Sequence, residues 1–417
     1  MSYGGVMPKV PPAVPPPVRR RPRDRKEQIA KASADAFSAL GYHAVSMDEI
    51  ASRVGISAAA LYRHASSKYD LFRDAVLALG QQLVDCTEGI VTDGDPDDAL
   101  DEQIAAIVDT AIANRNSGGL YRWEGRYLND ADQRVLMDQI KLVNRRLQQP
   151  LSAARPALTS HERWTLSAAA LSVIGSVADH HSPMPTGAMR TLLSRFAHEV
   201  LAAQFPVRDT ESGPHPDVES LAALAIPGDA GKYEALLRES LMLFHKNGFR
   251  ETSMEDIAAA VGIQASGIYR FFPSKADMLA ASYRRAADRV SGDVATIVSE
   301  ESDPERALLR LVQAYVARSF RDPELAYVYY AERVNLPDAD RAVLRNIQRS
   351  TVEAWTNLLV AARPEMATAE ARFRVHAAFA VVVDLGRLVQ YDDGPYARAC
   401  VRRMMEVVLF GDTLAAG

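Results

Sequence analysis

The sequence predicts an all-α protein built from two copies of one unit. Apolar residues such as Ile29, Ala36 and Phe37 recur at helical spacing, and leucine and alanine abound without strand-like alternation. A pattern that passes through Gly41 returns without a gap 207 positions later at Gly248. Internal repeats of this kind report directly on architecture. Since 417 residues exceed one ordinary hydrophobic core, we expect two units of about 200 residues each.

The repeated block predicts three short helices in each copy. The first helix stops at a glycine, which tolerates the left-handed conformation that closes a helix. A serine three residues before an acid then starts a second helix as a capping box, and another glycine breaks the chain before the third. These residues are Gly41, Ser46, Glu49 and Gly55 in the first copy, and Gly248, Ser253, Asp256 and Gly262 in the second. Helix, short glycine turn and helix form the helix-turn-helix pattern.

The third helix of each copy begins with small residues, which allow a close approach to base edges in the major groove. The block resembles the DNA-binding domain of TetR-family transcriptional repressors. The resemblance rests on Ser46, Ile50-Ala51, Val54-Gly55-Ile56, Leu61-Tyr62-Arg63-His64 and Ser67-Lys68, and on Ser253, Ile257-Ala258, Val261-Gly262-Ile263, Ile268-Tyr269-Arg270-Phe271-Phe272 and Pro273-Ser274-Lys275. The first copy departs from the family at Ala65, where phenylalanine is usual. The alternative is a three-helix unit that only packs against protein.

The repeat continues beyond the helix-turn-helix. Asp130, Asp132 and Leu136 return 208 positions later as Asp338, Asp340 and Leu344, so each half resembles a full regulator subunit. We predict the following organisation: a disordered proline-rich and basic arm (1–26), DNA-binding domain 1 (27–70), helical regulatory domain 1 (71–205), a linker (206–230), DNA-binding domain 2 (231–277) and helical regulatory domain 2 (278–417).

The resemblance implies that the two halves pair as a covalent pseudo-dimer, since TetR-family proteins usually work as homodimers. A coil of about 25 residues spans on the order of 25–30 Å, which suffices for side-by-side pairing. The alternative is that each half pairs with the same half of another chain in a homodimer or larger assembly.

Bulk properties exclude several classes of protein. The net charge of −5 does not by itself indicate nucleic acid, the two cysteines offer neither a disulfide framework nor a zinc site, and no stretch is apolar enough to span a membrane. Glycine-rich phosphate loops and hydrolase motifs are missing from the sequence. We therefore expect a cytoplasmic protein that is not an enzyme and carries no metal or cofactor.

The candidate DNA contacts fall into three groups. The basic arm can enter the minor groove or neutralise phosphates, and the front of each third helix can read bases. The family likeness implies that the remaining residues hold phosphates. The arm supplies Arg21, Arg23 and Arg25; the base-reading candidates are Ser57, Ala58, Ala59 and Arg63 with Gln264, Ala265, Ser266 and Arg270; the phosphate-holding candidates are Ser46, Tyr62, His64 and Lys68 with Ser253, Tyr269 and Lys275. A solvated tail is the alternative for the arm.

The family likeness also implies a small, fairly apolar effector, whose binding switches the DNA-binding domains. Aromatic residues are candidates for its pocket, against the alternative of ordinary core packing: Tyr121, Trp123, Tyr127 and Trp164 in half one, and Tyr327, Tyr330 and Trp355 in half two.

The sequence therefore predicts a ligand-responsive repressor that reads an imperfect palindromic operator in double-stranded DNA with two non-identical recognition helices. The rival hypothesis is a sensor or interaction protein in which only one helix-turn-helix still binds DNA. Ala65 argues against the first copy, and the lack of a basic arm argues against the second.

Overall fold

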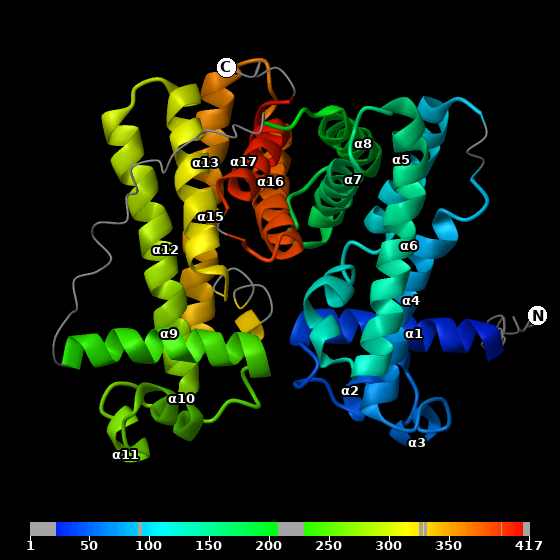
Figure 1. Cartoon of the computed structure of the whole chain (residues 1–417). Helices are drawn as coiled ribbons and strands as arrows, with labels where there is room; N and C mark the ends of the chain where they lie inside the picture. The colour runs from blue at the N-terminus through cyan, green and yellow to red at the C-terminus, as the bar shows by residue number, and fades with distance from the viewer. Residues whose placement is uncertain are drawn as a thin grey trace, which may run out of the picture.

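The structure, a computed structural model, describes residues 22–90, 94–206, 229–324, 328, 332–392 and 394–411. Half one contains α1 (Pro22–Leu40), α2 (Met47–Val54), α3 (Ala58–Leu61), α4 (Lys68–Cys86), α5 (Pro96–Ala113), η1 (Leu120–Glu124), η2 (Gly125–Tyr127), α6 (Asp130–Ala154), α7 (Ser160–Gly175), η3 (Ser176–Ala178) and α8 (Thr186–Ala202). Half two contains α9 (Asp229–Asn247), α10 (Met254–Val261), α11 (Ala265–Ile268), α12 (Lys275–Glu300), α13 (Pro304–Arg321), η5 (Arg333–Asn335), α15 (Asp338–Ala362), α16 (Thr368–Leu388) and α17 (Pro395–Phe410). The described residues form no strand, so the chain is all-α, with two TetR-like units in tandem (Figure 1).

Local sequence signals set the ends of the short helices. The Ser46 Oγ accepts the backbone N–H of Glu49 at 3.1 Å and starts α2, and Ser253 and Asp256 form a full capping box at α10. Gly55 and Gly262 end these helices with φ values of 70° and 73°. Only glycine adopts this left-handed region readily, which explains a glycine at both positions.

Each DNA-binding domain shares its core with the regulatory segment above it. In half one, Phe37 and Phe72 pack with Leu120 and Leu136. In half two, Phe244 and Met278 pack with Leu336, among other residues. The recognition helices pack on α2 and α10, and the long helices α4 and α12 lead upward from the same domains into the regulatory domains (Figure 1). The core of each helix-turn-helix is thus continuous with that of the segment above it.

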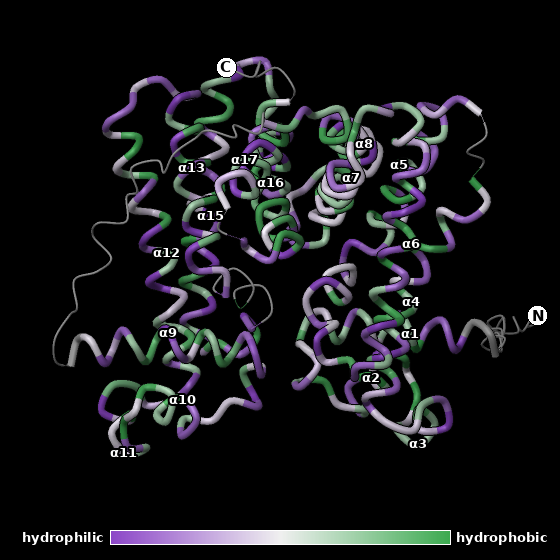
Figure 2. The backbone as a smooth tube through the Cα atoms, viewed as in Figure 1, coloured by the Kyte–Doolittle hydropathy of each residue, from purple (hydrophilic) through white to green (hydrophobic). Residues whose placement is uncertain are grey.

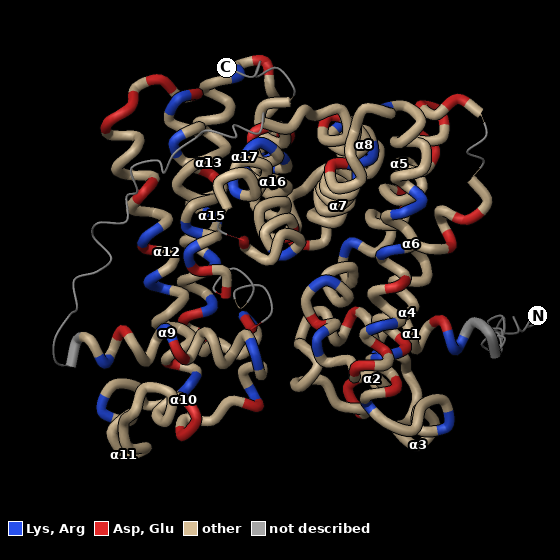
Figure 3. The backbone as a smooth tube through the Cα atoms, viewed as in Figure 1, with Lys and Arg blue, Asp and Glu red and all other residues tan. Residues whose placement is uncertain are grey.

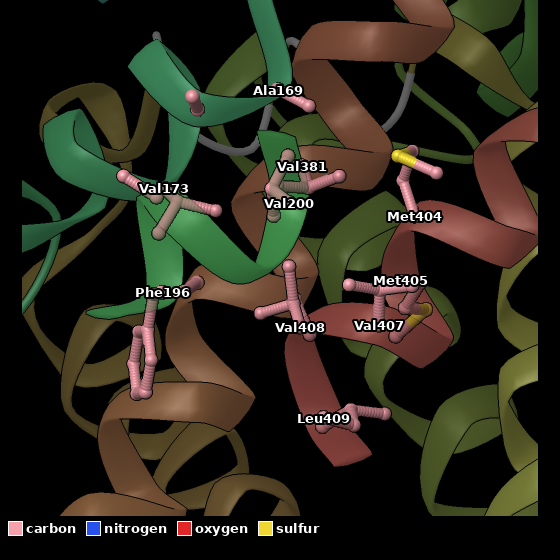
Figure 4. Packing of buried hydrophobic residues seen from close by; sticks show 14 of the residues in the cluster. Ala169, Val173, Phe196, Val200, Val381, Met404, Met405, Val407, Val408 and Leu409 are labelled. Atoms are coloured by element: carbon pink, nitrogen blue, oxygen red, sulfur yellow. The ribbon is translucent and has the colours of Figure 1, made fainter. Parts of the chain in front are cut away.

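The two halves meet through α7 and α8 of half one and α16 and α17 of half two. One apolar cluster runs through all four helices and continues into both regulatory domains. Val173, Phe196, Val381 and Val408, all fully buried, lie at the centre of this contact (Figure 4). Hydrophobic stretches run along α16 in the middle of the molecule (Figure 2). Burial of this kind removes apolar area from water and is the main force that holds the halves together.

Polar side chains also cross the contact between the halves. The His180 and His376 rings stack with centroids 4.0 Å apart and an interplanar angle of 9°. Burial lowers the pKa of both imidazoles, to about 4 for His376. Both rings are therefore neutral at neutral pH, and stacking brings no charge repulsion.

The prediction of a wholly disordered arm is wrong for its last five residues. Pro22 opens α1, so the chain from Pro22 to Lys26 is helical. Proline has a backbone torsion suited to the first turn of a helix, and the charged residues that follow are compatible with helix. The rest of the arm, 1–21, and most of the predicted linker, 207–228, lie outside the described residues.

Within the described ranges, no helix is long and apolar enough to cross a membrane. The same residues hold no cluster of three or more potential metal ligands. Cys86 is half-buried and Cys400 is buried.

Truncation of Phe196 should test how much the contact between halves stabilises the chain. Phe196→Ala leaves a cavity at a fully buried position, so we expect the free energy of unfolding to fall by about 3–5 kcal/mol. Met137→Ala is the control, because its side chain is 48% exposed. Urea denaturation followed by circular dichroism measures the free energy of unfolding of both variants. Equal losses in Phe196→Ala and Met137→Ala would contradict a stabilising role for Phe196 at the contact between the halves.

Candidate nucleic-acid interface

The two recognition helices, α3 and α11, lie at the same end of the molecule and turn their front residues to solvent (Figure 1). Ser57, Ala59 and Arg63 are exposed on the first, and Gln264, Ser266 and Arg270 on the second. Ala58 is half-buried and Ala265 is exposed. The base-reading candidates of each copy therefore share one surface.

The residues that open the two recognition helices are used differently. Ser57 caps α3, since its Oγ accepts the backbone N–H of Ala60 at 3.2 Å. Gln264 stands at the same position of α11 and makes no side-chain capping bond. Its amide is the group that can bond adenine through two hydrogen bonds, which a serine hydroxyl cannot do. The two helices thus present different chemistry at equivalent places.

Tyr62 and Tyr269 are large side chains left in solvent. They are 55% and 52% exposed. Each follows a fully buried anchor, Leu61 or Ile268, which holds the helix to the core while the tyrosine points away. A ring with a hydroxyl at such a place is suited to a phosphate contact. His64 is likewise exposed.

Lys68 and Lys275, which were predicted to hold phosphates, bind backbone carbonyls of the protein instead. Lys68 donates to the backbone carbonyl of His43 at 3.3 Å. Lys275 donates to three carbonyls, those of Phe249, Arg250 and Thr252, at 2.7–2.9 Å. Each ammonium also lies over an aromatic ring of the same turn. Burial lowers the pKa of both lysines. Here these cations hold the turn between the first two helices.

Most of the basic arm lies outside the described residues, including Arg21, and nothing is described of the Arg23 side chain. Arg25 donates to the carbonyl of Val54 at 3.4 Å and so packs back on the end of α2. Around the two recognition helices, basic and acidic residues are interspersed (Figure 3).

Two buried carboxylates tie the DNA-binding domains to the regulatory domains. Glu124 accepts the backbone N–H of Tyr42 at 3.2 Å, and Glu332 accepts that of Phe249 at 2.9 Å. Both glutamates are buried. Arg126 of half one pairs with Glu332 of half two, which joins the halves at this level. Sequence reasoning missed these residues, although the 208-residue spacing of the two glutamates could have revealed them.

The two turns that these carboxylates hold also lie near the opposite half. A Cβ placed at Gly41 would meet Val334 of half two at 3.0 Å, and one at Gly248 would meet Tyr127 of half one at 3.9 Å. Tyr127 in turn stacks on Tyr42, with ring centroids 5.6 Å apart. The relative position of the two recognition helices is therefore set by contacts directly above them.

The predicted effector residues do not form one site. Tyr121 lines a cavity of about 20 Å³ between α4, α5 and the end of α7. Trp123 is buried and its indole N–H donates to Asp179 at 2.9 Å. Tyr127 ends η2 and stacks on Tyr42, and Trp164 is half-buried on α7. In half two, Trp355 is buried against Phe379 and Tyr315, while the side chains of Tyr327 and Tyr330 lie outside the described residues.

Comparison with known proteins bears on both copies. The family profile described as "Bacterial regulatory proteins, tetR family" matches residues 29–75 and again 236–282. Both helix-turn-helix segments therefore belong to this family. The chain is similar to the transcriptional activator FasR of Mycolicibacterium smegmatis, with 48% identity over 67 residues, which cover 16% of this chain and 29% of FasR. It is also similar to the repressor KstR2 of Rhodococcus jostii, with 28% identity over 135 residues, which cover 32% of this chain and 66% of that protein. Both matches span less than two thirds of the relative.

Solved structures were also found. KstR2 of Mycobacterium tuberculosis has 20% identity and a TM-score of 0.39, covering 43% of this chain and 94% of that one. FadR of Bacillus halodurans has 21% identity and a TM-score of 0.37, covering 45% of this chain and 97% of that one.

Glu124 should make the stability of this chain depend on pH. Burial raises the pKa of this carboxyl from 4.5 to about 7. Between these values the folded protein binds more protons than the unfolded chain, so the contribution of Glu124 to stability falls as the pH rises through this window. In Glu124→Gln we expect that fall to be absent, so the variant gains about 3 kcal/mol on wild type between pH 4.5 and 8. Urea denaturation across this range measures it.

The amide introduced by Glu124→Gln keeps an oxygen that can accept the Tyr42 N–H, so the hydrogen bond is retained. Glu365→Gln, at an exposed position, is the control. A constant difference between wild type and Glu124→Gln at every pH would contradict the assignment.

Proposed function

We propose that this chain is a DNA-binding transcriptional regulator in which one polypeptide supplies both recognition helices of an operator complex. The observation that carries the proposal is the presence of two helix-turn-helix domains whose recognition helices are both exposed at one end of the molecule. The four-helix contact between α7, α8, α16 and α17 supports pairing within the chain. Covalent linkage makes such pairing independent of protein concentration.

The proposed operator is an imperfect palindrome. A recognition helix reads bases through the side chains at its front, and these differ between the two copies at Ser57 and Gln264. A pair of half-sites read by different side chains therefore differs in sequence. The residues predicted to read bases and to hold phosphates remain part of this proposal, with Lys68 and Lys275 acting through the turns that they hold.

The proposed direction of regulation is repression, through occupancy of the operator. FasR is by name an activator and KstR2 a repressor. A reporter gene placed behind the operator measures this direction: expression that rises when the chain is deleted supports repression, and expression that falls contradicts it.

The test of DNA binding starts with genomic DNA from the protein's source, from which the purified chain should enrich one imperfect palindrome. Tyr62→Ala and Tyr269→Ala are then compared on that sequence. Both tyrosines are more than half exposed, so neither change should unfold the chain. We expect each to weaken binding at least about tenfold.

A loss confined to one of the two variants would favour the alternative of a sensor or interaction protein with a single working helix-turn-helix. Met242→Ala, at an exposed position on α9, is the matched control and should leave affinity unchanged. No enriched sequence from intact protein would contradict DNA recognition altogether.

We further propose a small apolar effector. The cavity beside Tyr121 is lined mostly by apolar groups, including Leu79, Leu83 and Ala111. Its volume of about 20 Å³ admits roughly one water molecule, so a larger ligand must push α4 and α5 apart. Because α4 continues from the helix-turn-helix, such a movement reaches the recognition helix. In half two, the buried indole N–H of Trp355 has no hydrogen-bond partner among the described residues, and a ligand acceptor would satisfy it.

Filling the cavity should separate effector response from DNA binding. Ala111→Leu occupies the space beside Tyr121, so we expect wild-type operator affinity but little release by a saturated fatty acyl ligand that releases the wild type. Fluorescence anisotropy of labelled operator measures both. If the ligand releases the variant and the wild type equally from the operator, the cavity beside Tyr121 is not the effector site.

A further inference from the structure

A buried arginine of half two, Arg374, crosses the contact between the halves to reach a glutamate of half one. The side chain of Arg374 on α16 is 4% exposed and forms two hydrogen bonds with Glu199 on α8, at 2.8 and 2.9 Å. It also donates to the carbonyl of Val408 at 2.9 Å, and its guanidinium lies 4.3 Å from the centre of the Phe196 ring. A two-pronged bond of this kind fixes both distance and orientation.

The repeat shows what stands at the equivalent place in the other half. Aligning the two halves at the same shift of 208 places Leu166 opposite Arg374, and Val407 opposite Glu199. Leu166 is fully buried and has no charge to offer. Val407 is also fully buried and carries no charge. The neighbouring Glu406 lies 3.6 Å from Arg402 of its own helix. The arginine–glutamate contact therefore has no mirror image within the chain.

A second contact is equally one-sided. Asp384 on α16 accepts hydrogen bonds from Arg122 and from the Ser172 hydroxyl of half one, both at 2.6 Å. The residue equivalent to Asp384 in half one is Ser176, and the residue equivalent to Ser172 in half two is Ala380. The carboxylate thus comes from half two, and its donors come from half one.

These differences act against pairing between like halves. If two copies of half one met in the same geometry, Glu199 would face Leu166 on both sides, and the two hydrogen bonds from Arg374 would be lost. If two copies of half two met, Arg374 would face Val407 and would keep Glu370 of its own helix, 3.1 Å away, as its carboxylate partner. Asp384 would face Ala380 in place of Ser172, again on both sides. Removing one partner of a buried ion pair is strongly destabilising, because the other charge is left uncompensated.

We propose that this interface is selective: half one binds half two, of the same chain or of a second copy, and rejects its own like. This inference rests on the pairing proposed above. Every paired unit then contains one recognition helix from half one and one from half two. Dimers in which half one meets half one, or half two meets half two, are excluded.

Complementation between two full-length variants tests the inference. Arg374→Glu disrupts the pairing surface of half two, and Glu199→Arg disrupts that of half one. In a mixture, half one of the first chain can bind half two of the second through the native contact, and the two altered surfaces can bind through the reversed contact. We expect a two-chain species at least about tenfold more abundant in the mixture than in either variant alone. Native mass spectrometry without DNA measures it.

The same exchange within one chain is the control. The double variant E199R/R374E should be a single-chain species with a thermal midpoint close to that of wild type, and Glu406→Gln should behave as wild type. A mixture without two-chain species, or single variants that already pair as well as the mixture, would overturn the proposal. Because no DNA is present, this outcome is independent of the DNA-binding proposal.

If charge reversal disrupts folding, milder variants decide the question. Arg374→Leu and Glu199→Leu should each lower the thermal midpoint, and the double variant should recover most of the loss, because replacing both members of a buried ion pair by apolar groups is often neutral. If the thermal midpoint of the double variant falls by the sum of the two single-variant losses, the proposal is overturned.

Discussion

The packing of α16 across α7 is the constraint on which the rest of the molecule depends. The buried apolar residues of these helices and of α8 and α17 form one cluster that extends into both regulatory domains. Each half therefore completes its hydrophobic core with residues of the other, and the position of each DNA-binding domain follows from that contact. The charged and polar groups within it add orientation, since the apolar residues alone would allow sliding.

Below this contact, the structure transmits position through a few buried groups. Glu124 and Glu332 hold the turns that follow α1 and α9, and Lys68 and Lys275 hold the same turns from the other side. The turn of each DNA-binding domain is thus fixed between a carboxylate from above and an ammonium from the start of α4 or α12. The first residue of each long helix therefore carries the cation that holds the turn of its own DNA-binding domain.

Local signals made much of the fold predictable. The capping serines and the left-handed glycines lie within a few residues of the groups they organise, so Ser46, Gly55 and Gly262 could be assigned from the sequence. The role of Lys68 could not, because a long side chain reaches either solvent or a nearby carbonyl and the pattern alone does not choose. The helical start at Pro22 was hidden by the prolines and arginines before it. The contact between Arg374 and Glu199 depends on tertiary packing, which the spacing of charges along the chain does not encode.

The stacked pair of His180 and His376 has a consequence for how such an interface can change. In a symmetric homodimer each substitution alters the contact twice, so a new ring or charge must be accommodated at two places at once. In this chain the residues equivalent to His180 and His376 are Leu388 and Ala168, so the ring pair occurs on one side of the axis only. Because both halves belong to one chain, a single mutation changes this interface at one place, and one side can carry chemistry that the other side lacks.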